Sequence, residues 1–224
     1  MESTFFWYSL DNQEELLHDQ GKWIELINRY LKINKGMKVL DLGCGPGFFS
    51  VMLTNLGCQV IGIDYSDKML EEARNNARKF KANVEFQKMD VQDLAFQDEI
   101  FDLIITRNVT WNLEKPVQAY QEMVRVLKKQ GHLLNIDGNH YYHYQDQDYS
   151  RAGHSDHQHM EGIDVSIIDN IAKELKLSYV LRPQYDIEIL KEIGFQQIES
   201  EILSKEKTKE GKELIRQFLI HAIK

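Results

Sequence analysis

The chain of 224 residues contains only three prolines, no low-complexity tract and no long apolar run. Scarce proline together with 42% hydrophobic residues argues against disorder, which is typical of polar, proline-rich chains. No window holds the ~18 consecutive apolar residues of a membrane-spanning helix, and residues 1–10 lack the basic segment and apolar core of a secretory signal. We therefore expect neither a membrane anchor nor secretion.

The chain also lacks an excess of basic charge and has only two cysteines. Its 27 basic residues against 35 acidic ones give a formal net charge of −8. A long phosphate backbone needs clustered lysine and arginine to release its counterions, so a small molecule or a protein is a better candidate partner than nucleic acid. We expect Cys44 and Cys58 to be reduced thiols, which is typical of a cytoplasmic protein.

The stretch from Val39 to Gly47 combines a short apolar run, one acidic residue and three glycines at every second position. Glycine has no Cβ, so it permits positive φ and lets the backbone approach a ligand closely. The apolar spacing of residues 48–56 predicts a helix after the loop, whose first amide groups would point back at a ligand. Strand, glycine loop and helix would form the first half of a βαβ nucleotide site.

The glycine spacing distinguishes two kinds of nucleotide ligand. A dinucleotide fingerprint that begins at Gly43 needs its third glycine at position 48, which is Phe48. Asp41 beside the loop would repel a pyrophosphate and would suit a ligand that carries an ammonium or sulfonium charge. The order Asp41-x-Gly43-x-Gly45-x-Gly47 resembles the first motif of the class I S-adenosylmethionine-dependent methyltransferases.

This resemblance covers about residues 36–137 and implies S-adenosylmethionine as the cofactor. It implies a Rossmann-like methyltransferase fold: an α/β, doubly wound, mostly parallel seven-stranded sheet with N-terminal helices and a cap insertion after strand five. One domain over residues 1–224 would comprise an N-terminal helical cover (1–35), the cofactor-binding core (36–137), a substrate or cap insertion (138–183) and C-terminal strands (184–224). The predicted cofactor-binding residues are Asp41, Gly43, Cys44, Gly45, Gly47, Asp64, Tyr65, Asp90, Val91, Arg107 and Asn108.

Asp64 is the expected ribose-binding residue. It ends a predicted strand over residues 59–63 and lies 17 positions beyond Gly47. An acidic residue about 20 positions after the glycine loop accepts hydrogen bonds from ribose hydroxyls in βαβ nucleotide sites. The alternative is an aspartate at the start of a helix over residues 67–80, which Ser66 could cap.

Asp90 and Val91 follow a predicted third strand over residues 83–89. In the family that the chain resembles, an aspartate here accepts a hydrogen bond from the adenine amino group, and the next backbone amide donates to the ring. The alternative is an aspartate that forms the turn at the strand end.

The apolar run of residues 101–105 predicts a strand buried on both faces. The carboxyl end of such a strand faces the ligand crevice in open α/β sheets, so Asn108 and Trp111 are expected where methyl donor and acceptor meet. Amino-directed members of the resembled family often carry Asn/Asp-Pro-Pro-aromatic at this point. Only the first and last residue types are kept here, so methylation of nucleobase amino groups is not indicated.

Helical spacing predicts a helical segment over residues 12–33 and a helix from Pro116 to Lys128 that stops at Gly131. The aromatic stretch over residues 4–8 would either pack against the sheet or form a lid across the ligand site.

The remaining strands are expected at the end of the sheet. A fifth strand is predicted over residues 132–136, and antiparallel strands are predicted over residues 194–203 and 214–223. The charged run over residues 205–213 is interpreted as a solvated loop between the last two strands.

The sheet does not require residues 138–183, which begin with a segment rich in histidine and tyrosine. Loops at the carboxyl end of a sheet commonly carry substrate contacts, so this insertion is the expected acceptor pocket and cap, with a helical second half over residues 163–177. The predicted catalytic residues are His140 and Tyr141, and the predicted substrate-binding residues are Trp7, Trp111, His140, Tyr142 and Arg182.

The histidines of this insertion raise the question of a metal site. His154, His157 and His159 are zinc-ligand types at close spacing. They lack the apolar pattern that would hold them on a helix or strand, and no cysteine lies nearby, so a polar loop is the preferred interpretation and we expect no bound metal.

These features predict transfer of a methyl group from S-adenosylmethionine to nitrogen or oxygen of a small acceptor. The sulfonium is already activated, so the protein mainly has to orient the acceptor and exclude water. His140 or Tyr141 could act as an optional base, and Trp111 could hold a cation over its ring. Two alternatives stay open: a non-catalytic S-adenosylmethionine-binding sensor or partner domain, and a nicotinamide-dependent oxidoreductase, which the glycine spacing disfavours.

Overall fold

The computed structural model describes residues 2–149 and 165–224, which form one seven-stranded sheet in the order β3-β2-β1-β4-β5-β7-β6. Strands β1 to β5 pair in parallel, whereas β7 lies antiparallel between β5 and β6. The strands are β1 (Lys38–Leu42), β2 (Gln59–Asp64), β3 (Glu85–Lys88), β4 (Phe101–Arg107), β5 (Leu127–Gly138), β6 (Gln197–Lys207) and β7 (Glu213–Ile223). The predicted doubly wound, mostly parallel α/β sheet is confirmed.

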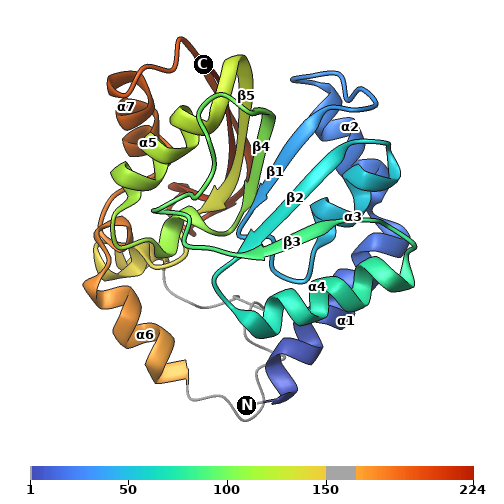
Figure 1. Ribbon diagram of the computed structural model, residues 1–224. Coiled ribbons are helices and arrows are strands. Elements are labelled where there is room, and N and C mark those ends of the chain that lie inside the picture. The colour runs from blue at the N-terminus through green and yellow to red at the C-terminus, as the bar shows by residue number, and fades with distance from the viewer. Residues whose placement is uncertain (1, 150–164) are drawn as a thin grey trace.

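Helices cover both faces of the sheet (Figure 1). One face carries α1 (Glu2–His18), α2 (Gln20–Asn28), α3 (Phe48–Asn55) and α4 (Asp67–Lys79). The other carries α5 (Pro116–Val126) and α7 (Gln184–Glu192). The helix α6 (Val165–Glu174) and the start of α1 lie beyond the arrowheads of β1 and β2. Short 3₁₀ turns lie at Thr110–Asn112, Tyr142–Tyr144, Gln147–Tyr149 and Lys176–Ser178.

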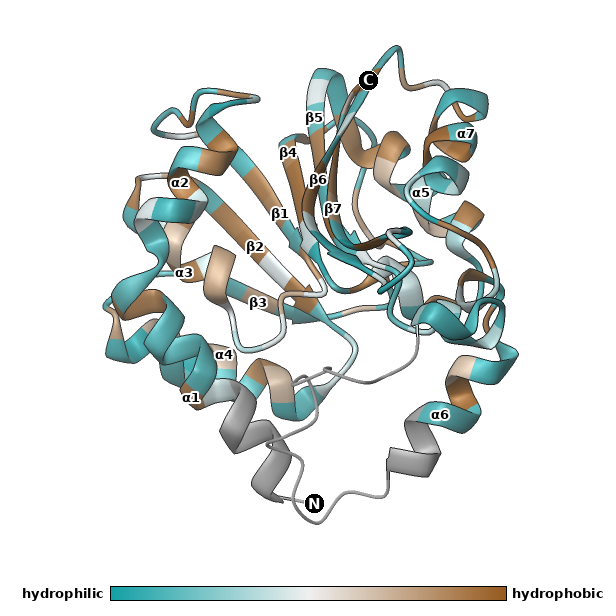
Figure 2. Cartoon of the chain, turned by 180° about the vertical axis from the view of Figure 1, so that it is seen from behind, coloured by the Kyte–Doolittle hydropathy of each residue, from teal (hydrophilic) through white to brown (hydrophobic). Residues whose placement is uncertain are grey.

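Alternating strand residues supply two separate cores. Val39, Leu103 and Ile105 pack toward α2 and α3, whereas Leu40 and Ile104 pack toward α5 and α7. Successive side chains of a strand point to opposite faces, so a strand covered on both faces has to be apolar at nearly every position. Figure 2 shows these apolar residues along the strands.

The boundary between α5 and β5 differs from the prediction. The helix ends at Val126 and β5 begins at Leu127, so Gly131 lies inside a strand and does not stop a helix. The register between β4 and β5 shifts next to this glycine, Gln130 has a φ of 62°, and a Cβ at Gly131 would approach the carbonyl oxygen of Lys128 to 2.8 Å. Gly131 is therefore required by an irregularity in the strand.

The prediction of a charged loop over residues 205–213 is also wrong, because the loop is shorter than predicted. Strand β6 continues through Lys207 and β7 begins at Glu213, which leaves a short turn. Lys205 Nζ lies 3.0 Å from a carboxylate oxygen of Glu213 on the neighbouring strand. Charged residues on both faces suit an edge strand that is solvated on both sides, which the apolar pattern alone does not detect.

Candidate active site

The glycine loop follows β1 at the carboxyl end of the sheet. Gly43, Gly45 and Gly47 have φ values of 68°, 51° and 91°, in the left-handed region that L side chains rarely adopt. A Cβ at Gly43 would lie 2.4 Å from Val109 Cγ2, whereas a Cβ at Gly45 would meet no atom within 4 Å. Gly43 therefore serves close packing inside the protein, and Gly45 leaves an open face on which a ligand can lie.

Asp41 lies beneath this loop and is only 2% exposed. Its Oδ2 accepts hydrogen bonds from the backbone N and the Oγ of Ser50 at 2.8 and 2.6 Å, which satisfies a donor in the first turn of α3. Burial raises the pKa of Asp41 to about 6, although the bonds from Ser50 and the charge of Arg107 favour the ionised form. Asp41 thus supports the loop from below and does not line an open surface.

The cysteine of the loop is buried as well. Burial raises the pKa of the Cys44 thiol well above its usual value, and both Cys44 and Cys58 are free thiols. A buried, protonated thiol is inert, so Cys44 contributes packing and its backbone rather than reactivity.

Asp64 ends β2 and joins the glycine loop to the next turn. One carboxylate oxygen accepts from Gly45 N at 2.9 Å and the other accepts from Ser66 N at 2.8 Å. Ser66 itself caps α4 through a bond from Met69 N, so the helix-capping role belongs to the serine. Burial raises the pKa of Asp64, while these backbone donors lower it. Each carboxylate oxygen keeps a second lone pair, and the ribose contact stays a prediction.

The other cofactor-side residues have more varied surroundings. Tyr65 is 73% exposed beside Asp64. Asp90 Oδ1 accepts from Gln92 N at 2.8 Å, which is the turn-forming arrangement that was the alternative to adenine binding. Val91 is buried. The turn does not occupy every lone pair of Asp90, so the adenine contact also stays a prediction.

Arg107 joins the end of β4 to the N-terminal helices. Its guanidinium donates to both carboxylate oxygens of Glu15 at 2.6 and 2.9 Å. The same group lies 5.0 to 5.3 Å from the ring centroids of Trp23, Phe48 and Phe49. These partners make Arg107 an anchor of the helical cover, whereas its predicted cofactor contact is untested.

A second connection joins the cover to the glycine loop itself. Asn76 of α4 donates to Pro46 O at 3.0 Å and to Asn12 Oδ1 at 3.2 Å, and Gln13 donates to Asn76 at 2.8 Å. The first helix is therefore coupled to the loop through one buried asparagine. The side chain of Trp7 lies outside the described residues, so the choice between lid and packing for residues 4–8 stays open.

Aromatic rings gather where β4 and β5 end. The Trp111 ring stacks on Tyr141 with centroids 5.1 Å apart and lies 5.3 Å from the His140 ring. Tyr144 continues the series between Tyr141 at 5.8 Å and Tyr179 at 5.7 Å. We call these five side chains, Trp111, His140, Tyr141, Tyr144 and Tyr179, the aromatic wall.

Two neighbouring predictions have different outcomes. Asn108 is exposed directly after β4 with a φ of 56°, and its carbonyl accepts from Trp111 Nε1 at 3.0 Å. Tyr142 packs edge-on against Tyr149, with the ring centroids 5.0 Å apart. Asn108 thus lies exposed after the carboxyl end of β4 and its cofactor contact stays a prediction, while a substrate contact by Tyr142 has no support from its surroundings.

The prediction that Arg182 binds substrate is wrong. Arg182 is 0% exposed and forms ion pairs with Asp137 at 3.0 Å and with Asp186 at 2.8 Å. It also donates to Thr110 Oγ1 at 2.6 Å. Asp137 is not among the site residues predicted from the sequence, although it directly follows the predicted fifth strand, where side chains reach the ligand crevice.

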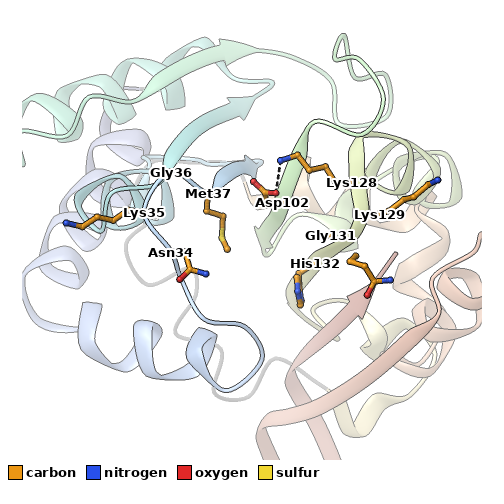
Figure 3. Close-up of a pocket in the computed structure, with 10 residues that line it drawn as sticks. Asn34, Lys35, Gly36, Met37, Asp102, Lys128, Lys129, Gly131 and His132 are labelled. Carbon is orange, nitrogen blue, oxygen red and sulfur yellow. Dashed lines mark hydrogen bonds and ion pairs between the residues drawn. The ribbon is translucent and has the colours of Figure 1, made fainter.

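A cavity of about 400 Å³ lies at the opposite, amino end of the strands (Figure 3). Met37, Asp102 and Lys128 are among its lining residues, and Lys128 Nζ is paired with Asp102 at 2.7 Å. Figure 3 shows the side chains of Lys35 and Lys129 directed away from it. The cavity is separate from the glycine loop, because the loop lies at the other end of β1.

Two absences hold for the described part of the chain. No group of three or more histidine, cysteine, aspartate or glutamate side chains could hold a metal ion there. None of the helices in that part is long and apolar enough to cross a membrane. His154, His157 and His159 lie outside the described residues, so the prediction of no metal at these positions is untested.

A family model described as a methyltransferase domain matches residues 33–202. The chain belongs to this family. The predicted class I S-adenosylmethionine-dependent methyltransferase is thereby confirmed, with its Rossmann-like fold and its cofactor.

Among curated proteins, the methyltransferase domain is similar to a ubiquinone biosynthesis O-methyltransferase of Alkalilimnicola ehrlichii, with 28% identity over 57% of this chain and 53% of that protein. It is also similar to a demethylmenaquinone methyltransferase of Listeria welshimeri, with 32% identity over 52% of this chain and 51% of that protein. The chain thus spans about half the length of the curated relatives it matches.

Among solved structures, the methyltransferase domain resembles phosphoethanolamine N-methyltransferase 2 of Haemonchus contortus in complex with S-adenosylmethionine. The TM-score is 0.66 at 18% identity, over 92% of this chain and 52% of that chain. This likeness shows the fold.

Proposed function

We propose that the chain binds S-adenosylmethionine on the glycine loop and transfers its methyl group to nitrogen or oxygen of a small acceptor. The observation that carries the proposal is the open face at Gly45 beside the carboxylate of Asp64, at the ends of two adjacent parallel strands. A Cβ at Gly45 would enter the space that a ligand needs, and Asp64 has lone pairs for two vicinal hydroxyls.

The residues present fit this cofactor, which supplies an activated, positively charged methyl donor when bound. Asp41 carries a carboxylate whose ionisation is disfavoured by burial, so a nearby cation would stabilise it. Asp64 and the loop amides would hold the ribose and orient the ligand. Asp90 and Val91 would contact the adenine at the end of β3.

The aromatic wall is the proposed acceptor surface. Flat rings favour a planar or cationic acceptor through stacking and cation–π contacts. The two arginines at the ends of this region, Arg107 and Arg182, are both paired with carboxylates, so neither offers a guanidinium to an acceptor phosphate. A phenolic or amine acceptor therefore suits the wall better than a phosphorylated one. One curated relative is named an O-methyltransferase, which agrees with an oxygen acceptor.

Calorimetric titration with S-adenosylmethionine, S-adenosylhomocysteine and NAD tests the cofactor. We expect the first two to bind and NAD not to bind. Turnover of labelled methyl groups against 4-methylcatechol and phenethylamine then tests transfer and separates oxygen from nitrogen acceptors. Cofactor binding without methyl transfer to either acceptor or to a wider pool of metabolites would favour a sensor domain over an enzyme.

A further inference from the structure

His140 of the aromatic wall is held by a buried carboxylate. Its Nε2 lies 3.2 Å from Asp137 Oδ1, while its side chain keeps 23% exposure. Asp137 itself is 0% exposed at the end of β5. A partly exposed imidazole whose Nε2 rests on a buried carboxylate has its other nitrogen, Nδ1, outside that contact.

The carboxylate of Asp137 is saturated with donors. Its Oδ1 also accepts from Gly138 N at 2.8 Å, and its Oδ2 accepts from Thr110 Oγ1 and Trp111 N. Arg182 Nη1 lies 3.0 Å from the same Oδ2. Burial alone would raise the pKa of Asp137, but the Arg182 guanidinium and the hydrogen-bond donors hold it well below its usual range. An ionised Asp137 can only accept, so His140 Nε2 has to carry the hydrogen.

The buried charged groups behind His140 have a net negative charge. Asp137 and Asp186 are two acidic groups that share the single guanidinium of Arg182. Burial would lower the pKa of Arg182, but both carboxylates raise it, so the guanidinium stays charged. The buried trio carries a formal charge of −1, which a protonated His140 would neutralise.

Resting on the methyl transfer proposed above, we propose that Asp137 is a positioning residue that holds His140 as the Nε2–H tautomer, which makes Nδ1 the base for the methyl acceptor. The acceptor hydroxyl or ammonium gives its proton to Nδ1. The freed lone pair forms the bond to the methyl carbon while the methyl–sulfur bond breaks, and its electron pair stays on sulfur. The imidazolium is stabilised by its Nε2–H bond to Asp137. Arg182 and Thr110 hold Asp137 in place.

The substitution Asp137→Asn gives a sharp test. The three donors at Oδ2 require an acceptor, so the single amide oxygen of asparagine should take that place and leave the NH₂ group facing His140 Nε2. The imidazole would then have to accept at Nε2 and carry its hydrogen on Nδ1, the tautomer that cannot act as the base. In the serine-protease triad the equivalent aspartate-to-asparagine change acts through the wrong tautomer.

The tautomer is measured by ¹⁵N-detected NMR on histidine-labelled protein, with His140→Gln used to assign the signal. We expect neutral wild-type His140 to be the Nε2–H form and the Asp137→Asn variant to be the Nδ1–H form. An Nδ1–H form in the wild type overturns the inference, even if Asp137→Asn does not fold. The tautomer is measured without turnover. Failure of this inference therefore shows as an Nδ1–H form in the wild type, whereas failure of the proposed function shows as a wild type that methylates no acceptor.

Kinetics with 4-methylcatechol, or with whichever acceptor the wild type methylates, provide the second readout. For Asp137→Asn we expect kcat at pH 7 to fall ~10²-fold, within the range for general base catalysis, while KM for the acceptor changes little. The loss should shrink at a pH where the acceptor ionises without a base. His140→Gln should show the same loss of kcat and the same pH dependence, and kcat of the double variant should be no lower than that of either single variant. A kcat within about twofold of wild type for either single variant, or additive losses, would contradict the inference.

Discussion

The two halves of the carboxyl end of the sheet are held together in different ways. Around β1 and β2, backbone amides and short polar contacts hold the loop, with Gly45 bonded to Asp64 and Ser50 bonded to Asp41. Around β4 and β5, a buried ion network joins Asp137 to Arg182, which lies 45 positions away in the chain. The cofactor half depends on local hydrogen bonds, and the acceptor half depends on paired buried charges.

This difference has an energetic consequence. A hydrogen bond to a charged group contributes about 1.5–3 kcal/mol, whereas breaking a buried ion pair costs about 3–5 kcal/mol because a charge is left unpaired. Loss of Arg182 on the acceptor side should therefore act mainly on folding. Loss of Asp64 on the cofactor side should act mainly on ligand affinity.

The largest expected effect is the loss of Arg182. Arg182→Met would leave Asp137 and Asp186 facing one another without a cation, and we expect the free energy of unfolding to fall by about 3–5 kcal/mol. Urea unfolding measures the change, and Arg78→Met, at an exposed arginine of α4, should stay within about 0.5 kcal/mol of the wild type. If Arg182→Met lowered the free energy of unfolding by less than about 1 kcal/mol, the acceptor half would not depend on buried charge pairs more than the cofactor half does.

The second effect concerns ligand affinity. Asp64→Ala should weaken S-adenosylmethionine binding by about 1.5–3 kcal/mol, because it removes the ribose acceptor and releases Gly45 N. Calorimetry on the folded variant measures the change. Asp67→Ala, three residues further on and exposed at the start of α4, is the matched control and should bind as the wild type does. Unchanged affinity for Asp64→Ala would refute the ribose assignment.

A third effect of similar or smaller size depends on pH. The pKa of Asp41 is raised from 3.8 to about 6 in the folded state, so its contribution to stability is fully present below pH 3.8 and is lost as the pH rises through 6. Asp41→Asn should remove this dependence and raise the free energy of unfolding at pH 8 by about 1–3 kcal/mol.

Denaturant unfolding of both proteins at pH 4, 6 and 8 provides the check on Asp41. The gain in free energy of unfolding from Asp41→Asn should vanish toward pH 4, where the wild-type Asp41 carboxyl is protonated. An equal difference at all three values would mean that the effect is not one of ionisation. We also expect Asp41→Asn to bind S-adenosylmethionine more weakly at pH 8, because the variant lacks the negative charge near the sulfonium.

The smallest effect is expected at the helical cover. Glu15→Ala removes the partner of Arg107 and the acceptor of Trp23 Nε1, and a half-buried ion pair of this kind is worth about 1 kcal/mol. Stability should fall by that amount and S-adenosylhomocysteine affinity by a few-fold. Glu14→Ala, at the exposed neighbouring glutamate, controls for helix propensity. An affinity equal to that of the wild type would make the cover plain packing.

The comparison also explains what could be predicted from the sequence. The run from Asp41 to Gly47 is local, because strand, turn and helix follow one another within a few residues, and the elements that it predicts are the ones observed. The offset of Asp64 from the loop predicts its ribose role, and the structure places Asp64 at the end of the neighbouring strand β2. Asp90 was assigned to adenine, although its observed bond to Gln92 is the local turn that was the stated alternative.

The contacts of the acceptor half could not be predicted in the same way, because they join residues that are distant in the sequence. The sequence predicts that Arg182 binds substrate, because it does not show that Asp137 and Thr110 reach this residue from other elements. The spacing of four residues between Arg182 and Asp186 is a local sign of this pair, although Arg182 lies just ahead of α7 and not on it. The sequence predicts a helix stop at Gly131, since the irregularity in β5 depends on its pairing with β4 and not on local sequence.

The most direct test of the account is a crystal structure with bound S-adenosylhomocysteine. We predict that the ribose hydroxyls lie within hydrogen-bond distance of Asp64, that the ligand crosses the open face at Gly45, and that its sulfur faces the aromatic wall near Trp111 and His140. A ligand bound in the cavity at the amino end of the strands, or one whose ribose lies away from Asp64, would contradict the assignment of the active site.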